Sequence, residues 1–161
     1  MKMTPAFLGA TVAVLLTGCS STPVALAPVG PNPAGLDNDT TNGRLEVFSA
    51  LTGRTEGNNP TWFQHTDYQI CDWHGKPLKH VENATGYYAT APRLISLPPG
   101  HYLVKAEAKD YTSVEVPVVI YSGRTTKVHL DDTWRPVSGG RKSEFVSLPA
   151  GSPVGWSVAA R

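Results

Sequence analysis

The sequence has neither an excess of charge nor a cluster of basic residues. Among its 161 residues, 14 Lys and Arg nearly balance 13 Asp and Glu, which leaves a formal net charge of +1. No run of Lys or Arg occurs, and aromatic residues are not interleaved with basic ones. Such a chain has no strong field with which to attract a polyanion or an anionic lipid surface. We therefore expect no nucleic-acid partner.

Recognisable catalytic motifs are also absent. The sequence contains no Gly-x-Ser-x-Gly, no His-Glu-x-x-His and no glycine-rich phosphate loop. Cys71 and His74 are three positions apart, but on a strand that runs into a turn this spacing does not bring a thiol and a base reliably together. His101 and His129, even if each faces a neighbour across strands, are more typical of solvent-facing residues than of metal ligands. We expect no enzymatic activity, no catalytic residues, no metal and no cofactor.

No apolar run is long enough to cross a bilayer as a helix, which takes about 20 residues. The run within Pro5–Leu16 follows Lys2 and is stopped by Gly18 and Cys19. A positive residue, a short apolar run and a small-residue site form the layout of a secretory signal. We predict that residues 1–18 are removed, which leaves equal numbers of basic and acidic residues.

The sequence Leu16-Thr17-Gly18-Cys19 at this site resembles the lipobox of bacterial lipoproteins. The resemblance implies cleavage before Cys19, a thioether from its thiol to a diacylglyceryl group and a further acyl chain on its amino group. Each buried methylene contributes about 0.8 kcal/mol, so two or three chains hold a protein at membrane lipid. Ser20, where an Asp would favour the inner membrane, favours the outer one by analogy with proteobacterial sorting. The predicted location is the cell envelope, lipid-anchored and facing the periplasm or the cell surface. An ordinary secretory signal with a chance cysteine is the alternative.

With Cys19 acylated, Cys71 is the one thiol left in an exported chain. An internal disulfide is therefore not expected, and core packing has to stabilise the fold. Cys71 lies in the strand-like run Tyr68–Trp73. A small buried residue is the simplest interpretation, and a reactive or intermolecular thiol is the alternative.

Residues 19–42 are rich in Pro, Ala, Gly, Ser, Thr and Asn and show no period of 2 or 3.6. Such a composition buries too little apolar surface to order itself. We predict a flexible tether with a mean reach of roughly 25 Å, or about 70 Å when fully extended. Its role would be to lift the following domain away from the lipid headgroups.

From residue 43 to residue 131 the pattern changes to short alternating runs separated by Gly and Pro turns. In the clearest run, Tyr102, Val104, Ala106 and Ala108 face one way. This pattern predicts an all-β fold, an antiparallel β-sandwich of about seven strands of the immunoglobulin-like or prealbumin-like kind. The predicted strands are Arg44–Ala50, Thr66–Trp73, Leu78–Val81, Arg93–Leu97, His101–Ala108, Ser113–Tyr121 and Thr125–Leu130.

The order of these signals resembles a known domain family. Leu97-Pro98-Pro99-Gly100-His101-Tyr102-Leu103-Val104, the run Val116–Ile120 and the run Gly123–Leu130 are similar to the second half of carboxypeptidase-regulatory-like and PEGA-like domains. These are small prealbumin-type sandwiches. The resemblance implies a stalk, spacer or ligand-presenting module, usually without catalysis.

Residues 132–161 form a C-terminal extension with two short apolar runs, Glu144–Leu148 and Val154–Ala159. We predict a hairpin that closes the sandwich. The alternative is a strand that adds to the exposed sheet edge of a partner.

Trp62, Phe63, Trp73 and His74 are the candidate ligand-binding residues, because aromatic rings in loops can stack on sugars. Caps on the core are the alternative role for these rings. Two functions follow. The first is a membrane-anchored, non-catalytic envelope lipoprotein whose sandwich contacts another envelope protein or acts as a structural spacer. The second is a glycan- or peptidoglycan-binding module that uses the loop aromatics.

Overall fold

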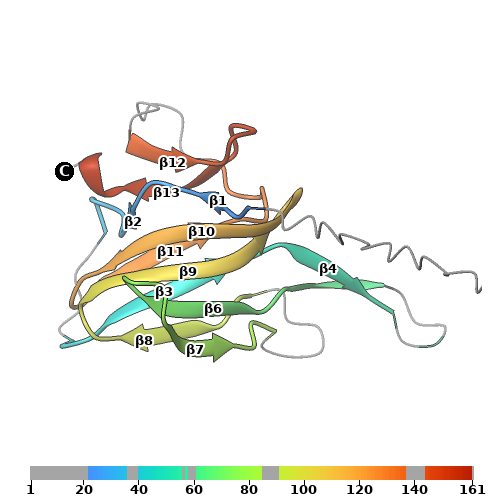
Figure 1. The fold of residues 1–161 in the computed structure, drawn as a ribbon, viewed down its shortest axis with the longest axis horizontal. Helices are drawn as coiled ribbons and strands as arrows, with labels where there is room; N and C mark the ends of the chain where they lie inside the picture. The colour runs from blue at the N-terminus through green and yellow to red at the C-terminus, as the bar shows by residue number, and fades with distance from the viewer. Residues whose placement is uncertain are drawn as a thin grey trace, which may run out of the picture.

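The computed structural model describes residues 22–35, 40–55, 57, 61–84, 91–136 and 144–160. Within these ranges the chain is built almost wholly of strands (Figure 1). In chain order they are β1 (Val24–Ala25), β2 (Val29–Gly30), β3 (Gly43–Phe48), β4 (Leu51–Arg54), β5 (Trp62–His65), β6 (Tyr68–Asp72), β7 (Pro77–Val81), β8 (Leu94–Leu97), β9 (Gly100–Ala108), β10 (Tyr111–Ile120), β11 (Thr125–His129), β12 (Phe145–Ser147) and β13 (Pro153–Ser157), with a 3-10 turn at Val158–Ala160. The predicted all-β sandwich is confirmed.

The strands form two sheets and a separate arm. The larger sheet has the order β12-β13-β2-β10-β9-β6-β7, with β1 also paired to β10, and the smaller has the order β11-β3-β8. The arm consists of β4 and β5 alone. Pairing is mixed, because β1 and β2 run parallel to β10 and β11 runs parallel to β3. The strands in the described residues outnumber the predicted seven, because pieces of two to four residues are too short to show a period.

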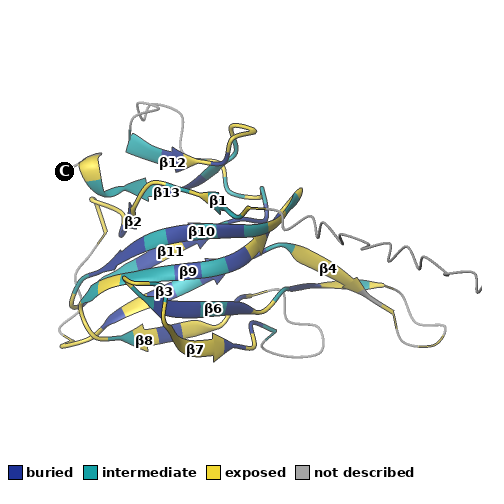
Figure 2. Cartoon of the chain, viewed as in Figure 1, coloured by how far each residue is buried: buried dark blue, intermediate teal, exposed yellow. Residues whose placement is uncertain are grey.

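The core lies between the two sheets, and the alternation of the strands builds it. In β9 the face that carries Val104, Ala106 and Ala108 is buried, as the alternating pattern predicts, and Tyr102 packs against the same core. Figure 2 shows the buried positions running along the strands that face each other. Full burial of one such Val, Leu or Ile contributes roughly 1.5–3 kcal/mol. Residues with no exposed surface include Leu45, Val47, Ile70, Val104, Val114, Val116, Val118, Val128 and Leu130.

The N-terminal segment belongs to the sandwich. β1 pairs with Val114–Glu115 of β10, and Val29 of β2 pairs with Val118. Val29 has no exposed surface. The prediction of a tether over residues 19–42 is therefore wrong for residues 22–35. Two-residue strands are held by backbone hydrogen bonds, which leave no periodic pattern in the sequence.

Pro117 lies inside β10, where a missing N–H usually breaks the ladder. The carbonyl of Glu115 accepts a hydrogen bond from the N–H of Leu26 at 2.9 Å. Residues two apart in a strand point their N–H groups to the same side, so the N–H missing from Pro117 would also face the β1–β2 side. It falls where β1 has ended at Ala25 and β2 begins only at Val29. The proline thus fits a gap in the ladder.

The C-terminal strands β12 and β13 form a hairpin, and Trp156 of β13 lies opposite Gly30 of β2. β13 also passes close to β11. A Cβ atom at Gly155 would lie 2.9 Å from the carbonyl oxygen of Lys127 and 2.5 Å from a methyl group of Val29. Glycine at position 155 is therefore required for this approach.

The arm extends beyond the end of the sandwich (Figure 1). Its base is fixed by backbone hydrogen bonds: the N–H of Ala50 donates to the carbonyl of Glu107 at 3.0 Å, and the N–H of Thr66 donates to the carbonyl of Ala50 at 2.8 Å. The side chain of Ser49 also donates to the carbonyl of Thr66.

Asn83, which is fully buried, ties neighbouring segments to this base. Its Nδ2 donates to the carbonyl of Val47 at 2.9 Å and to Oγ of Ser49 at 3.0 Å, while its Oδ1 accepts from the N–H of Arg93 at 2.9 Å. A buried amide with these partners is satisfied on both sides. The arm therefore starts from a rigid platform.

Substitution of Val29 by Ala tests the place of the N-terminal segment in the core. Val29→Ala should lower the free energy of unfolding by about 2 kcal/mol, because it removes two buried methyl groups and leaves a cavity. Urea denaturation of the chain from Ser20 onward measures this. The matched control is Ala27→Ser at an exposed position, with an expected change below about 0.5 kcal/mol. Two equally small effects would mean that the segment is a free tether after all.

Candidate functional site

The sandwich has two ends that differ in what they carry. β1 runs parallel to β10, and both β10 and β6 run antiparallel to β9. It follows that β1, β6 and β10 all begin where β9 ends. We call this end, from which the arm also projects, the β1 end. We call the opposite end the Trp73 end, because Trp73 directly follows β6 there.

The structure does not bring together the four residues predicted to bind a ligand. Trp62 and Phe63 lie on β5 in the arm, on the side of the β1 end. Trp73 and His74 lie in the turn between β6 and β7, at the other end of the sandwich. The residues of the predicted lipobox fall outside the described part of the chain: Leu16, Thr17, Gly18 and Cys19.

Trp73 forms one wall of a shallow apolar trough on the outer face of the larger sheet. Its side chain is 54% exposed, and its ring meets the ring of His101 edge-on, with 5.6 Å between the centroids. Pro28, Val119 and Val158 complete the trough, which has a volume of about 480 Å³. Carbon surface dominates this lining, so the trough suits an apolar side chain of a partner better than a charged one.

The turn that carries Trp73 is rigid. Oδ1 of Asp72 accepts hydrogen bonds from the backbone N–H groups of His74 and Lys76, each at 2.9 Å. Gly75 has a φ of 84°, in the left-handed region that favours glycine. The side chain of His74 is exposed and does not line the trough, so of the predicted pair only Trp73 belongs to this surface.

A second candidate surface lies on the outer side of the smaller sheet, where a column of rings leads from β3 to the C-terminal hairpin. Phe48 stacks on His129 with 4.4 Å between centroids, and His129 stacks on Trp134 at 4.9 Å. Trp134 then meets Phe145 at 5.6 Å and Trp156 at 6.3 Å in edge-on contacts. These arrangements are the favoured ones for aromatic pairs.

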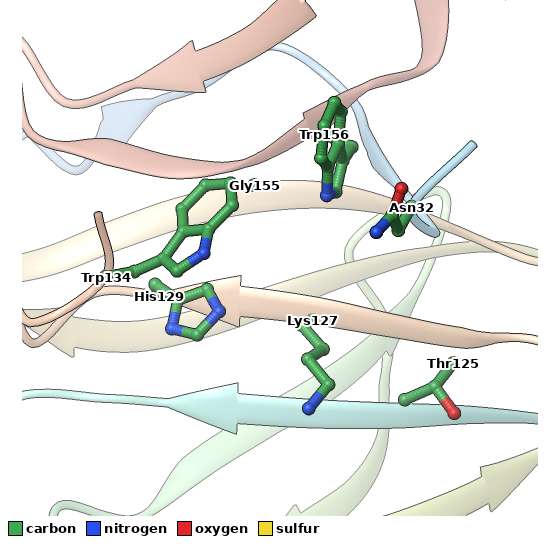
Figure 3. A pocket seen from close by; sticks show the side chains of 7 residues that line it. All are labelled: Asn32, Thr125, Lys127, His129, Trp134, Gly155 and Trp156. Carbon is green, nitrogen blue, oxygen red and sulfur yellow. The ribbon is translucent and has the colours of Figure 1, made fainter. Parts of the chain in front are cut away.

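A cleft of about 170 Å³ opens beside this column (Figure 3). In Figure 3, Trp134 and Trp156 lie on one side of β11, and the side chains of Thr125 and Lys127 extend to the other side. The volume is below the roughly 300–1,000 Å³ of typical small-molecule sites, so the cleft admits a single ring or side chain. The residues that line it are Asn32, Thr125, Lys127, His129, Trp134, Gly155 and Trp156.

His129 supplies an uncharged polar group to this cleft. Burial lowers the pKa of His129 from 6.5 to about 4; nearby Lys127 acts in the same direction, and Asp131 opposes it. The ring is therefore neutral at pH 7, and its buried Nδ1 has no hydrogen-bond partner among the described residues. Lys127 is engaged by Glu46, with 2.9 Å between Nζ and Oε2. A neutral ring suits an uncharged ligand, but His129 is a poor general base at neutral pH.

The remaining candidates, Cys71 and the pair of His101 and His129, do not form a shared site in the structure. Cys71 has no exposed surface, and burial raises the pKa of its thiol, so it fits the predicted small buried residue rather than a reactive thiol. His101 and His129 lie on different sheets. In the described ranges, no group of three or more His, Cys, Asp or Glu residues is placed to hold a metal ion. The same ranges contain no helix of the length and apolarity needed to cross a membrane.

Sequence reasoning missed the cleft, although part of its signal was present. Phe48 and His129 occupy alternate, outward positions next to the buried Val47 and Val128. Outward aromatic and histidine residues in paired strands indicate a covered outer face, and Trp134 covers it. The contribution of Asn32 had no sequence signal, because it comes from the segment that the composition assigned to a tether.

Mild acid should destabilise the fold through His129. As the pH falls, the unfolded chain binds a proton near pH 6.5 and the folded chain only near pH 4, so stability is lost within this interval. His129→Gln should reduce the loss, as measured by urea denaturation near pH 7 and near pH 5. His80→Gln, at a side chain that is 63% exposed, is the control and should keep it. An unchanged pH dependence in the His129 variant would contradict this assignment.

No family model, no curated protein and no solved structure matches this chain. The resemblance of residues 43–131 to carboxypeptidase-regulatory-like domains therefore stays a prediction, and the fold class rests on the strands and sheets described above.

Proposed function

We propose that this protein is a lipid-anchored lipoprotein of the cell envelope whose sandwich is a non-catalytic interaction module. Cys19 attaches it to membrane lipid, and the trough at the Trp73 end binds another envelope protein. The observation that carries the proposal is the separation between the point where the chain enters the fold and the exposed ring of Trp73. The chain enters the fold at the β1 end, where Val24 pairs with Val114, and the exposed ring of Trp73 lies at the opposite end.

The N-terminal sequence supports the anchored part of this proposal. Leu16, Thr17 and Gly18 precede Cys19 after a short apolar run with a positive residue before it. A thiol at the first mature position is the group that forms the thioether to a diacylglyceryl unit. The outer membrane is the proposed location, because Ser20 follows the cysteine.

The trough supports the interaction part. A tryptophan that leaves about half of its surface exposed and rests on a rigid turn has little conformational entropy to lose on binding. Tryptophan is also among the residues that dominate binding energy in protein interfaces. Because the trough lies at the end away from the proposed anchor, a partner beyond the membrane surface could reach the ring.

Replacement of the anchoring cysteine tests the first part. Cys19→Ser should abolish incorporation of a labelled fatty acid and leave the unprocessed precursor, because serine has no thiol for the thioether. Cys71→Ser is the matched control and should keep the label, since that thiol is buried. Labelling that survives Cys19→Ser would refute the lipoprotein assignment.

A photo-cross-linking residue at position 73 tests the second part in intact cells. The expected result is a discrete cross-linked product from position 73 and none from position 94, where Leu94 is similarly exposed at 49% on the smaller sheet. Trp73→Ala combined with a cross-linker at position 101 should lose most of the product. A central aromatic anchor typically contributes about 2 kcal/mol or more, which corresponds to about thirtyfold in affinity. Equal yields at positions 73 and 94 would contradict a binding role for the trough.

A glycan-binding module is the second candidate function, and the cleft favours it. Trp134 and Trp156 offer ring surface beside an uncharged imidazole and an amide, which is the combination that suits one sugar ring. This places the proposed sugar site away from Trp62 and Trp73. A sedimentation assay with purified peptidoglycan tests this function. Sedimentation that is lost in Trp156→Ala, together with no cross-linked product at position 73, would select this function over the first.

A further inference from the structure

The arm exposes apolar side chains on one face. Leu51 is 42% exposed and Phe63 is 56% exposed. Directly opposed residues of a hairpin share a face, and the pairs Leu51–His65 and Gly53–Phe63 place both apolar side chains on the same one. The ring of Phe63 lies beside Gly53, where a Cβ atom would be 3.5 Å from its Cε1. The ring is thus supported by the arm and open to the outside.

Within the described residues, the strands of the arm pair only with each other. The arm is a two-stranded sheet, and such a hairpin is at best marginally stable alone in water. Its apolar face looks onto an open hollow of about 530 Å³, which Ala108 and the turn at Lys109–Asp110 line from the other side. Exposed apolar surface of this kind indicates a contact with another apolar phase.

The length of chain before β1 places this face near the anchor. Val24, the first paired residue, is five positions after Cys19. Five fully extended residues span no more than about 18 Å. From Leu51 to Gly53, the partner of Phe63, the arm advances about 7 Å beyond the β1 end. If Cys19 is held in the bilayer, the β1 end stands no more than about 18 Å from it, and Phe63 reaches about 7 Å into that gap.

Two cations at the β1 end, Lys109 and Arg135, share one carboxylate partner. Lys109 pairs with Asp132, with 3.0 Å between Nζ and Oδ2, and Arg135 also contacts Asp132. These two basic groups are therefore engaged within the protein. A contact of Leu51 and Phe63 with lipid would rest on apolar burial, which salt does not screen.

We propose that the face of the arm formed by Leu51 and Phe63 inserts into the interfacial layer of the membrane that holds Cys19. This rests on the proposed lipid anchoring. The arm provides a second contact beside the acyl chains and fixes how the sandwich stands on the surface. Phe and Leu are among the side chains that interfacial segments bury at this depth of a bilayer.

The test replaces the natural anchor, so that it does not depend on acylation in the cell. The chain from Ser20 onward, which keeps every described residue, carries an N-terminal hexahistidine tag and is tethered to phosphatidylethanolamine–phosphatidylglycerol vesicles that contain a nickel-chelating lipid. An environment-sensitive fluorophore is attached at Thr55→Cys, an exposed position two residues after Gly53 on the same face as Leu51 and Phe63, or, as the control, at Leu78→Cys. Leu78 is 54% exposed and lies near the Trp73 end. The buried Cys71 is left unlabelled.

The expected result is a blue shift at position 55, quenching by spin-labelled lipid and no change in high salt, with none of these at position 78. Leu51→Ser with Phe63→Ser should lower the ratio of inserted to withdrawn arm by about tenfold or more, since the two apolar side chains that the bilayer would bury are removed. Equal signals at positions 55 and 78, or a shift that survives the double substitution, would overturn the proposal. So would a blue shift that appears without vesicles and rises with protein concentration, which would mean that the arm pairs two copies.

Failure of this test and failure of the anchor are distinguishable. Loss of fatty-acid labelling in Cys19→Ser reports on the natural anchor alone. Lipid quenching at position 55 reports on the arm under a synthetic anchor. If the protein is acylated but the arm shows no quenching, the proposed function stands and the proposed contact of the arm is wrong.

Discussion

The edge of β10 that faces away from β9 is the constraint on which the rest of the structure depends. A buried strand of ten residues cannot leave that row of N–H and C=O groups unpaired. β1 and β2 pair with it, and β2 passes the pairing on to β13. The N-terminal segment therefore sets where the chain enters and where the C-terminal hairpin lies. It also gives Pro28 to the trough and Asn32 to the cleft, so both candidate binding surfaces depend on the same pairing.

Alternation of apolar and polar residues predicted the part of the fold in which strands are long. β9, β10 and β11 appear close to their predicted bounds, because five or more alternating residues define both the strand and its buried face. The N-terminal segment carries no such pattern. A two-residue strand buries little beyond one side chain, here Val29. Its position is set by the sheet edge with which it pairs. Only the three-dimensional arrangement identifies that edge, so composition alone assigned the segment to a tether.

The sequence likewise predicted some residues of the candidate sites but not which of them lie close together. Trp73 was a candidate because aromatic rings near loops can stack on sugars, and the structure leaves its ring exposed. Trp62 and Phe63 were grouped with it by residue type, yet they lie beyond the opposite end of the sandwich. The ring column was missed because its members come from β3, β11 and the C-terminal extension, far apart in the chain. Residue type thus indicates a binding surface, while proximity comes only from the pairing of strands.

The short link before β1 also changes how the protein would present its binding surface. A free tether of residues 19–42 would have held the domain at a variable height and in any orientation. With Val24 paired, the link to Cys19 is limited to about 18 Å. β10, in contrast, spans about 33 Å as a rigid element between the β1 end and the Trp73 end. Height above the membrane would then come from the length of the sandwich, and orientation from the arm beside the anchor. A partner would meet the Trp73 surface at a nearly constant distance, which a flexible tether does not provide.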